Sequence, residues 1–301
     1  AFACGTITAA GTLGQVVPPS IVLILLADIV GVPVGELFMG AIVPSLLLVG
    51  CYITYILVRA WQFPHDAPAI HAITRGKIKA RVLKSLVPPL LLIVAVLGSI
   101  FFGIASPTES AAMGGGGAII LAWFHGRLNT SVLRESSTQT MKLTAMVFTI
   151  LVGATAFGLV FKSLGGDSLV KGFFDTLGGG TATFILVSMT LIFLLGFFLD
   201  FVEICFIVVP ILEPVARQMG IDLAWFALMI AINLQTSFLT PPFGFSLFYL
   251  KAVSPRSIKI QHIYRGVIPF VIMQLAVLIL VAIFPQIVSW LPETTEPYRI
   301  R

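Results

Sequence analysis

Two proline pairs, each inside a long apolar stretch, constrain the fold of this chain more than any other feature. The first stretch reads GTLGQVVPPSIVLILL and holds Pro18 and Pro19; the second reads LQTSFLTPPFGFSLFYL and holds Pro241 and Pro242. Proline has no N–H group, and its ring collides with the carbonyl group four residues earlier, so each pair interrupts a helix. At membrane depth, the backbone freed by such a break must be buried in protein or must line a hydrated cavity.

The composition predicts a membrane protein. Of the 301 residues, 58% are hydrophobic and 10% are charged, whereas soluble domains carry about 25% charged residues. The cysteines Cys4, Cys51 and Cys205 lie in apolar runs without metal-ligand spacing, so we interpret them as small buried side chains. The chain begins at Ala1 inside an apolar segment, which we interpret as a cut that leaves out a preceding membrane portion.

Apolar runs predict an all-α polytopic membrane protein with broken helices. The two runs beside residues 200–203 are too short for full crossings, which need about 20 apolar residues, so we expect a re-entrant hairpin there. Residues 164–178 are expected to form an interfacial helix. The predicted spans are 4–30, 36–60, 86–104, 108–124, 141–162, 182–199, 204–216, 223–252 and 264–291.

The basic residues predict the orientation of these spans. The loops 59–85, 125–142 and 251–265 hold 13 of the 18 basic residues but two of the 13 acidic ones. The positive-inside rule places these loops in the cytoplasm and the tail 292–301 outside. The same rule explains the net charge of +5 without a nucleic-acid partner.

The two halves of the chain repeat one order of elements. In each half a proline-pair break is followed by a short apolar segment, a turn, and a span with its own proline, Pro44 or Pro269. With the orientation above, the first broken helix runs from inside to outside and the second from outside to inside. Such an inverted-topology repeat is typical of secondary transporters, whose binding site lies between the repeats.

Each break offers ligands for a cation and for an anion. Unwound carbonyl groups and hydroxyls are hard oxygen donors, and the half-helix after each proline pair begins with free N–H groups. The alternative is a plain proline kink satisfied by neighbouring helices. The sodium-binding candidates are Gly11, Thr12, Gly14, Val17, Asp200, Thr236, Ser237 and Thr240, and the substrate-binding candidates are Ser20, Pro19, Pro242 and Gly244.

Two carboxylates, Asp200 and Glu203, lie at the tip of the expected hairpin. Carboxylates within a membrane are costly and mark functional sites by default, so this pair could bind a cation, relay protons or contact a partner. The alternative is that the tip reaches water and the carboxylates cap the second hairpin helix.

The segment SPTESAAMGGGG, residues 106–117, predicts structure rather than chemistry. Ser106, Pro107 and Glu109 have the spacing of a capping box with proline in the first turn. The four glycines that follow suit close contact between helices. The chain contains no Ser/His/Asp set, HExxH sequence or nucleotide-binding motif, so we do not expect an enzyme.

Four segments together resemble one family, the large membrane subunit, DctM type, of tripartite ATP-independent periplasmic (TRAP) transporters. They are GTLGQVVPPSIVLIL, SPTESAAMG, GFFLDFVEICFIVVPILEPVARQMGID and NLQTSFLTPPFGFSLFYLK. The resemblance covers nearly the whole chain. Within this family, the segments FLDFVEI and LQTSFLTPPFGFSLFYLK resemble the mannitol/chloroaromatic branch, which is associated with 2-oxo and 2-hydroxy monocarboxylates.

The resemblance implies a Na⁺-driven elevator-type transporter in the bacterial inner membrane, with Na⁺ as coupling ion and no other cofactor. The implied partners are a small four-helix membrane subunit, a periplasmic solute-binding protein and a small organic acid. A first-half hairpin is expected before Ala1, so this fragment alone is not expected to transport. The alternative is a single-component Na⁺/dicarboxylate symporter of the divalent-anion fold.

The expected organisation has four parts. Residues 1–60 end the first repeat, and residues 61–85 form a basic cytoplasmic linker. Residues 86–163 are the scaffold spans of the second repeat. Residues 164–301 hold the interfacial helix, the hairpin, the second broken helix and the last span.

Overall fold

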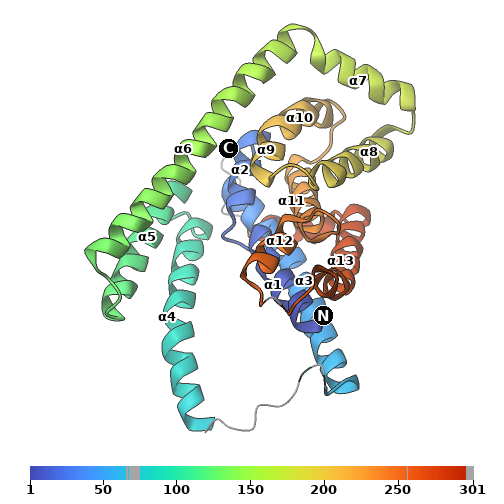
Figure 1. Cartoon of the computed structure of the whole chain (residues 1–301). Coiled ribbons are helices and arrows are strands. Elements are labelled where there is room, and N and C mark those ends of the chain that lie inside the picture. Colours follow the sequence, from blue (N-terminus) through green and yellow to red (C-terminus); the bar gives the residue numbers. More distant parts are fainter. Residues whose placement is uncertain (66, 68–74, 256, 296–301) are drawn as a thin grey trace. The chain divides into compact units, whose positions relative to one another are not determined.

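A computed structural model describes residues 1–65, 67, 75–255 and 257–295. Every regular element in this part of the chain is a helix, and it contains no strand (Figure 1). Part of the predicted linker 61–85 and the end of the tail lie outside the described residues.

The chain divides into two compact units. The boundary between them falls within α6, between residues 149 and 150. The second unit holds α4 (Arg75–Phe101), α5 (Pro107–Phe124) and the start of α6 (Thr130–Ser163). The first unit holds the rest of α6, α1 (Phe2–Thr12), η1 (Leu13–Gln15), α2 (Ile21–Val30), α3 (Val34–Gln62), α7 (Gly166–Leu177), α8 (Gly180–Leu195), α9 (Phe201–Glu203), the π-helical turn η2 (Ile204–Val208), α10 (Val209–Gln218), α11 (Leu223–Leu239), α12 (Phe245–Val253), α13 (Ile260–Ile283) and α14 (Gln286–Thr294).

Both proline pairs interrupt a helix, as the sequence predicts. In the first half the helix stops at Gln15 and resumes at Ile21; in the second it stops at Leu239 and resumes at Phe245. The peptide bond between the two prolines is cis in each pair. Each broken helix is followed by a long helix with an internal proline, α3 and α13, so the predicted order of elements is confirmed.

Helices of the first half pack against helices of the second half. Helix α1 of the first half packs on α13 of the second, and α11 of the second packs on α3 of the first. Gly5 and Gly266 approach so closely that a β-carbon on either would overlap backbone atoms of the other segment. In the reciprocal contact, Gly40 of α3 faces Leu228 of α11. The repeat therefore extends from the order of elements to their packing.

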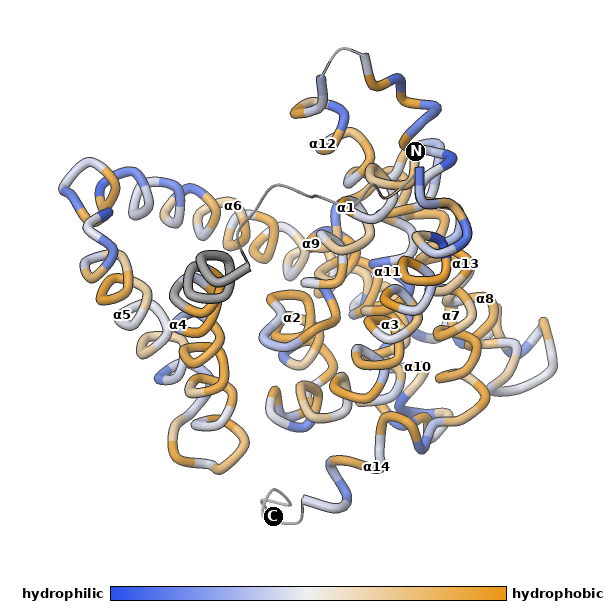
Figure 2. Tube along the Cα trace, turned by 90° about the horizontal axis from the view of Figure 1, so that it is seen from below, coloured by the Kyte–Doolittle hydropathy of each residue, from blue (hydrophilic) through white to orange (hydrophobic). Residues whose placement is uncertain are grey.

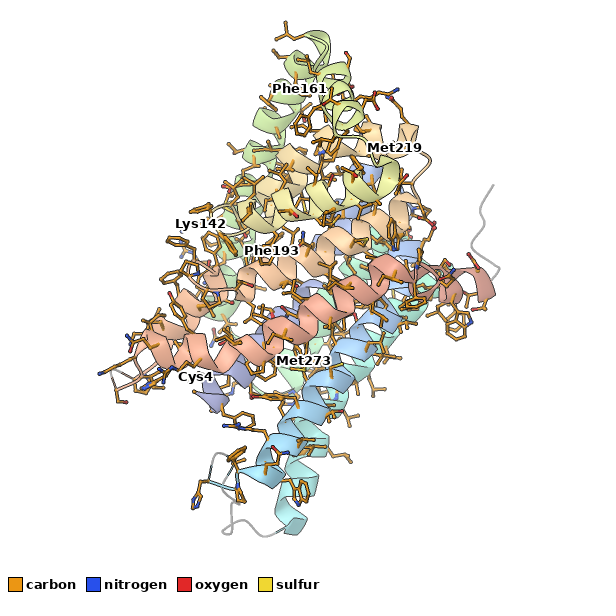
Figure 3. All side chains as sticks on the ribbon, turned by 90° about the vertical axis from the view of Figure 1, so that its right-hand side faces the viewer. Cys4, Lys142, Phe161, Phe193, Met219 and Met273 are labelled. Carbon is orange, nitrogen blue, oxygen red and sulfur yellow. The ribbon has the colours of Figure 1, made fainter. Side chains whose placement is uncertain are left out.

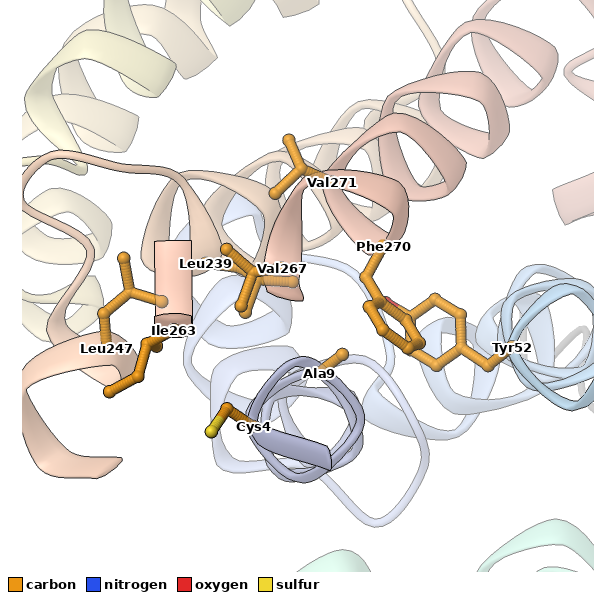
Figure 4. Close-up of a cluster of buried hydrophobic side chains, with 9 residues drawn as sticks. All are labelled: Cys4, Ala9, Tyr52, Leu239, Leu247, Ile263, Val267, Phe270 and Val271. Carbon is orange, nitrogen blue, oxygen red and sulfur yellow. The ribbon is translucent and has the colours of Figure 1, made fainter. Parts of the chain in front are cut away.

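Apolar side chains fill the crossing of these helices (Figure 4). The rings of Tyr52 and Phe270 meet edge to face, with centroids 4.9 Å apart. Cys4 belongs to this cluster and Cys205 is also buried, which confirms the sequence interpretation for these two thiols, whereas Cys51 is half-buried. The buried cluster contains Cys4, Ala9, Tyr52, Leu239, Leu247, Ile263, Val267, Phe270 and Val271.

The two short segments beside residues 200–203 form the predicted hairpin. Helix α8 ends at Leu195, and the chain turns before α9, η2 and α10. Helix α10 packs on α7, the helix that directly precedes α8. The second segment of the hairpin, which ends with α10, therefore returns to the start of the first segment, α8. Helices α7 and α8 meet at an angle of 114°, where Gly178 and Gly179 adopt positive φ values.

Within the second unit, α4 packs on α5. A β-carbon on Gly117 would overlap Leu92 of α4, and one on Gly114 would lie 3.3 Å from Val96. The close helix contact predicted for the glycine run is confirmed at these two positions. The two glycines between them face open space.

The predicted capping box begins α5. The Ser106 backbone N–H donates to Glu109 at 2.8 Å, and the Glu109 N–H donates to the Ser106 hydroxyl at 3.3 Å. Two other helix ends differ from the prediction. Helix α4 begins at Arg75, inside the expected linker, because lysine and arginine favour helices and prolong the apolar span. The expected last span divides into α13 and α14 at Pro285, where a proline starts a new helix.

Among the described residues, three helices, α3, α6 and α13, are long and apolar enough to cross a membrane, and the bent pair α7–α8 would add a fourth if the pair forms one span. Hydrophobic residues, orange in Figure 2, make up much of each long helix. On α3, Leu46, Ile53 and Leu57 have more than half of their surface exposed. Such a surface is unfavourable in water but is compatible with lipid tails. The predicted all-α polytopic membrane protein is confirmed.

Candidate functional site

A cavity of about 540 Å³ lies in the first unit, where α1 and η1, the hairpin tip and α12 meet. Binding sites for small molecules have volumes of about 300–1,000 Å³. The cavity joins the three features that the sequence singled out: the first break, the hairpin tip and the second broken helix. It is lined by Ile7, Thr8, Gly11, Thr12, Gln15, Asp200, Phe201, Phe238, Ser246, Tyr249, Leu250 and Val253.

Two helix faces form most of this lining. Positions 8, 11, 12 and 15 on one side and positions 246, 249, 250 and 253 on the other have the same i, i+3, i+4, i+7 spacing. That spacing places side chains on one face of a helix. The spacing is visible in the sequence and would have indicated four further polar lining residues, Thr8, Gln15, Ser246 and Tyr249.

The face formed by α1 and η1 presents oxygen atoms with unused acceptor capacity. The hydroxyl of Thr8 donates to the Cys4 carbonyl at 2.7 Å, and that of Thr12 donates to the Ala9 carbonyl at 2.9 Å. Each hydroxyl proton is therefore engaged, while lone pairs on the oxygen can still accept. The amide oxygen of Gln15 is buried and has no hydrogen-bond partner in the described part of the chain. A buried acceptor of this kind requires a partner, which a bound ligand or water can supply.

The hairpin tip combines helix capping with a place in the cavity. The Phe201 N–H donates to Asp200 Oδ1 at 2.8 Å, and the Asp200 N–H donates to Glu203 Oε2 at 3.1 Å. Both carboxylates are half-buried. This reciprocal pair is the capping arrangement predicted as the alternative for the tip. Asp200 nevertheless lines the cavity, whereas Glu203 does not.

The donors around the cavity suit a hard cation. They comprise one carboxylate together with neutral hydroxyl, amide and backbone oxygens, which are ligands for small cations rather than for transition metals. Within the described residues, no three His, Cys, Asp or Glu side chains are grouped so as to hold a metal.

Three of the sodium candidates line the cavity: Gly11, Thr12 and Asp200. Gly14 and Val17 belong to the same break but lie outside the lining. A β-carbon on Gly11 or on Gly14 would meet no atom within 4 Å, so packing does not require glycine at either position. At Gly11 the missing side chain leaves volume in the cavity itself.

The other three sodium candidates, Thr236, Ser237 and Thr240, lie at the end of α11 and outside the cavity lining. Each hydroxyl donates to a carbonyl of its own helix at 2.7–2.9 Å. Ser237 lies against the hairpin, because a β-carbon on Gly196 would overlap its hydroxyl oxygen. These hydroxyls form a second polar cluster, between α11 and the hairpin, and their role in sodium binding stays a prediction.

Of the substrate candidates in the first break, Ser20 acts as a helix cap. Its hydroxyl accepts a hydrogen bond from the Leu23 N–H at 3.4 Å and donates to the Gln15 carbonyl. It thereby fixes the start of α2 next to the end of η1. Pro19 is exposed, and neither residue lines the cavity.

The substrate candidates in the second break, Pro242 and Gly244, also support the backbone. The Tyr264 hydroxyl donates to the Pro242 carbonyl at 2.7 Å. A β-carbon on Gly244 would overlap the Phe238 carbonyl, so glycine is required for the close approach of the two half-helices. A direct role of either residue in substrate binding stays a prediction.

Comparison with protein families matches residues 1–287 to the family described as "Tripartite ATP-independent periplasmic transporter, DctM component". The chain belongs to this DctM family. The match covers both breaks, the hairpin and the cavity, and it confirms the resemblance to the DctM family found from the sequence motifs.

Individual DctM-type relatives are about equally similar to the chain. It is 31% identical over 298 residues to the sialic acid TRAP transporter permease SiaT of Haemophilus influenzae (strain 86-028NP), covering 98% of this chain and 47% of the relative. It is 30% identical to the sialic acid large permease SiaM of Vibrio cholerae, with 97% and 67% covered. It is 30% identical to the C4-dicarboxylate large permease DctM of Pseudomonas aeruginosa, with 97% and 68% covered.

The chain thus spans about half the length of the Haemophilus relative and about two thirds of the other two. All three are named as permease proteins of transporters, so the family is one of transporter components and not of enzymes.

Proposed function

We propose that this chain is part of the large permease subunit of a Na⁺-coupled, binding-protein-dependent transporter that imports a small organic acid. The observation that carries this proposal is the cavity bounded by α1, Asp200 and α12. In an inverted-repeat transporter, substrate and coupling ion bind where the broken helices of the two repeats meet.

The charges around the cavity support coupling to a cation. Among the described lining residues, Asp200 is the one acidic side chain, and no lysine or arginine lines the cavity. A carboxylate substrate beside Asp200 would be repelled unless a cation lay between them or close by. The positive end of the α12 helix, where Ser246 lines the cavity, provides further attraction for the substrate. Binding of the acid would therefore require binding of Na⁺.

The substrate is proposed from two sources that differ in detail. The sequence motifs resemble a branch associated with 2-oxo and 2-hydroxy monocarboxylates, while the relatives are named for sialic acid and C4-dicarboxylates. The identities of 30% and 31% do not favour one of these named substrates. We therefore propose a small organic acid, with a 2-oxo or 2-hydroxy monocarboxylate as the first compound to test.

The proposed partners are a small four-helix membrane subunit and a periplasmic solute-binding protein, in the bacterial inner membrane. We propose an elevator mechanism, in which the first broken helix of residues 1–60, together with the hairpin and the second broken helix of residues 164–301, moves against the scaffold spans of residues 86–163. The presence of two broken helices and a hairpin in the first unit supports this division of roles.

The test is uptake into proteoliposomes that contain the full-length large subunit and the small subunit. Purified binding protein and labelled 2-oxo, 2-hydroxy, C4-dicarboxylate and sialic acids are supplied outside, with Na⁺ or K⁺ gradients. Uptake of an acid that requires both Na⁺ and binding protein is expected. Uptake that persists in K⁺ would contradict Na⁺ coupling, and Na⁺-driven uptake without binding protein would favour the single-component symporter.

A further inference from the structure

Two apolar cavities lie next to each other in the first unit, away from the candidate site. The first, of about 270 Å³, lies between the end of α6, Ile29 of α2, η2 and the start of α10. The second, of about 310 Å³, lies between the end of α6, α7, α8 and α10. Phe161 of α6 and Ile211 of α10 line both, so these two side chains form the wall between the cavities.

Few polar side chains line these two cavities. Apolar side chains line the whole second cavity. Besides apolar side chains and a glycine, the first is lined by Thr155 and Lys162, and Lys162 follows Phe161 directly in the sequence. Lys162 is exposed and forms no ion pair with a described carboxylate. The paired cavities are therefore two apolar compartments with one free positive charge beside their shared wall.

The surrounding elements indicate where this charge lies in a membrane. Lys162 is in the last turn of α6, which is long and apolar enough to cross a membrane. The amphipathic helix α7 follows, with Leu169 and Phe173 lining the second cavity and charged residues such as Lys171 at other positions. Figure 3 shows Phe161 near this end of α6. An amphipathic helix after a span lies at the membrane surface, which is the depth of lipid headgroups.

We propose that the two cavities bind one anionic phospholipid with two acyl chains. One chain occupies each side of the wall formed by Phe161 and Ile211, and the phosphate pairs with Lys162. A lipid matches this site because it joins two apolar tails to one negative headgroup, whereas a partner helix would need one continuous groove. The lipid would bridge α6 and α7 to the hairpin helices. This proposal does not rest on the proposed transport function.

The experiment measures the phospholipid retained by the full-length protein purified in mild detergent, using native mass spectrometry. Phosphatidylglycerol and phosphatidylcholine with identical chains are offered after delipidation. Phosphatidylglycerol is expected to bind about fivefold better, the effect of one lysine near an anionic lipid. Lys162→Glu should abolish this preference, while Lys171→Glu, on a lysine outside both cavities, should keep it. Equal retention of the two lipids by the wild type would overturn the proposal.

A second pair of variants tests the cavity itself. Gly158 lines the first cavity and Gly153 does not, yet a β-carbon on either would meet no atom within 4 Å. Gly158→Leu is expected to reduce lipid retention at least fivefold, and Gly153→Leu to leave it unchanged. In the wild type, a single-chain lysophosphatidylglycerol should bind more weakly than the two-chain lipid, and free glycerol phosphate should not compete. Full retention by Gly158→Leu, equal binding of the single-chain lipid, or competition by glycerol phosphate would each contradict the proposal.

Discussion

The guanidinium group of Arg217 donates a hydrogen bond to the backbone carbonyl of Val30 at 3.0 Å, across 187 residues of sequence. Val30 is the last residue of α2, and Gly31 follows it in the left-handed conformation with φ of 72°. A helix leaves its last carbonyl groups without partners, and Arg217 satisfies one of them. The contact joins the second hairpin helix, α10, to the half-helix that follows the first break.

This contact predicts that arginine at position 217 cannot be replaced by lysine without loss. Arg217 also donates to Glu213 at 2.6 Å. The planar guanidinium group makes the contacts to Val30 and Glu213 from different nitrogen atoms, and the compact ammonium group of lysine cannot reproduce both. Arg217→Lys is expected to lower the free energy of unfolding by about 1 kcal/mol, the value of one hydrogen bond. Thermal unfolding in detergent measures the effect.

Glu213→Gln is the matched variant for the ion pair. It removes the charge of the pair but leaves the bond to Val30. Because the Arg217 side chain is 59% exposed, the pair is expected to contribute less than about 1 kcal/mol. A larger loss for Glu213→Gln than for Arg217→Lys would show that the ion pair, and not the helix cap, holds the two elements together.

The crossing of α1 and α13 predicts that neither glycine at the contact tolerates a methyl group. Gly5→Ala and Gly266→Ala should each destabilise the protein by about 1–3 kcal/mol, the usual cost of overpacking. Gly50→Ala in α3 is the control, because a β-carbon there meets no atom within 4 Å. It should be neutral or slightly stabilising, since alanine favours a helix over glycine. Equal unfolding midpoints for all three variants would contradict the close crossing.

The cavity predicts different results for two glycines of the first break. Gly11 lines the cavity and Gly14 does not, while a β-carbon at either position meets no atom within 4 Å. Gly11→Leu should therefore fill part of the binding volume and reduce uptake of the organic acid at least tenfold. Gly14→Leu should transport at close to the wild-type rate. Proteoliposome uptake, with thermal unfolding as a check on folding, distinguishes them, and equal uptake would place the substrate elsewhere.

The second polar cluster, at the end of α11, predicts that Thr240 affects the Na⁺ dependence of uptake. Thr240→Val keeps the shape of the side chain but removes the oxygen that donates to the Thr236 carbonyl at 2.7 Å. If that oxygen binds Na⁺, its loss costs about 1–3 kcal/mol. The Na⁺ concentration for half-maximal uptake should then rise about five- to a hundredfold. Thr190→Val, on an exposed threonine with the same type of intrahelical bond, is the control. An unchanged Na⁺ dependence in both variants would assign Thr240 to the kink alone.

The charge distribution predicts opposite sides for two exposed positions. Arg127 lies in a loop assigned to the cytoplasm, and Thr294 ends α14 in the tail assigned to the outside. Single cysteines at these positions, in a protein with its native cysteines replaced, should react with an impermeant thiol reagent from opposite sides of the membrane. Labelling from the same side would contradict the inverted orientation of the repeats.

The sequence by itself determined the local interruptions of this protein. Proline removes a donor wherever it stands, so the breaks at Pro18–Pro19 and Pro241–Pro242 followed from residue chemistry alone. The carboxylate three residues after Asp200 likewise made a capping pair one of the two alternatives for the hairpin tip, because both partners lie within one helical turn. The all-helical membrane fold followed from long apolar runs with few charges.

The tertiary structure decided which of these local features form one site. Gln15 and Ser246 line the same cavity only because α1 packs on α12 and α13, a contact made close by Gly5 and Gly266. The sequence showed one face on each helix but did not show that the faces meet, because packing between distant segments depends on the whole set of crossings. The same packing left Thr240 and Gly244 outside the cavity, although each lies beside a proline break.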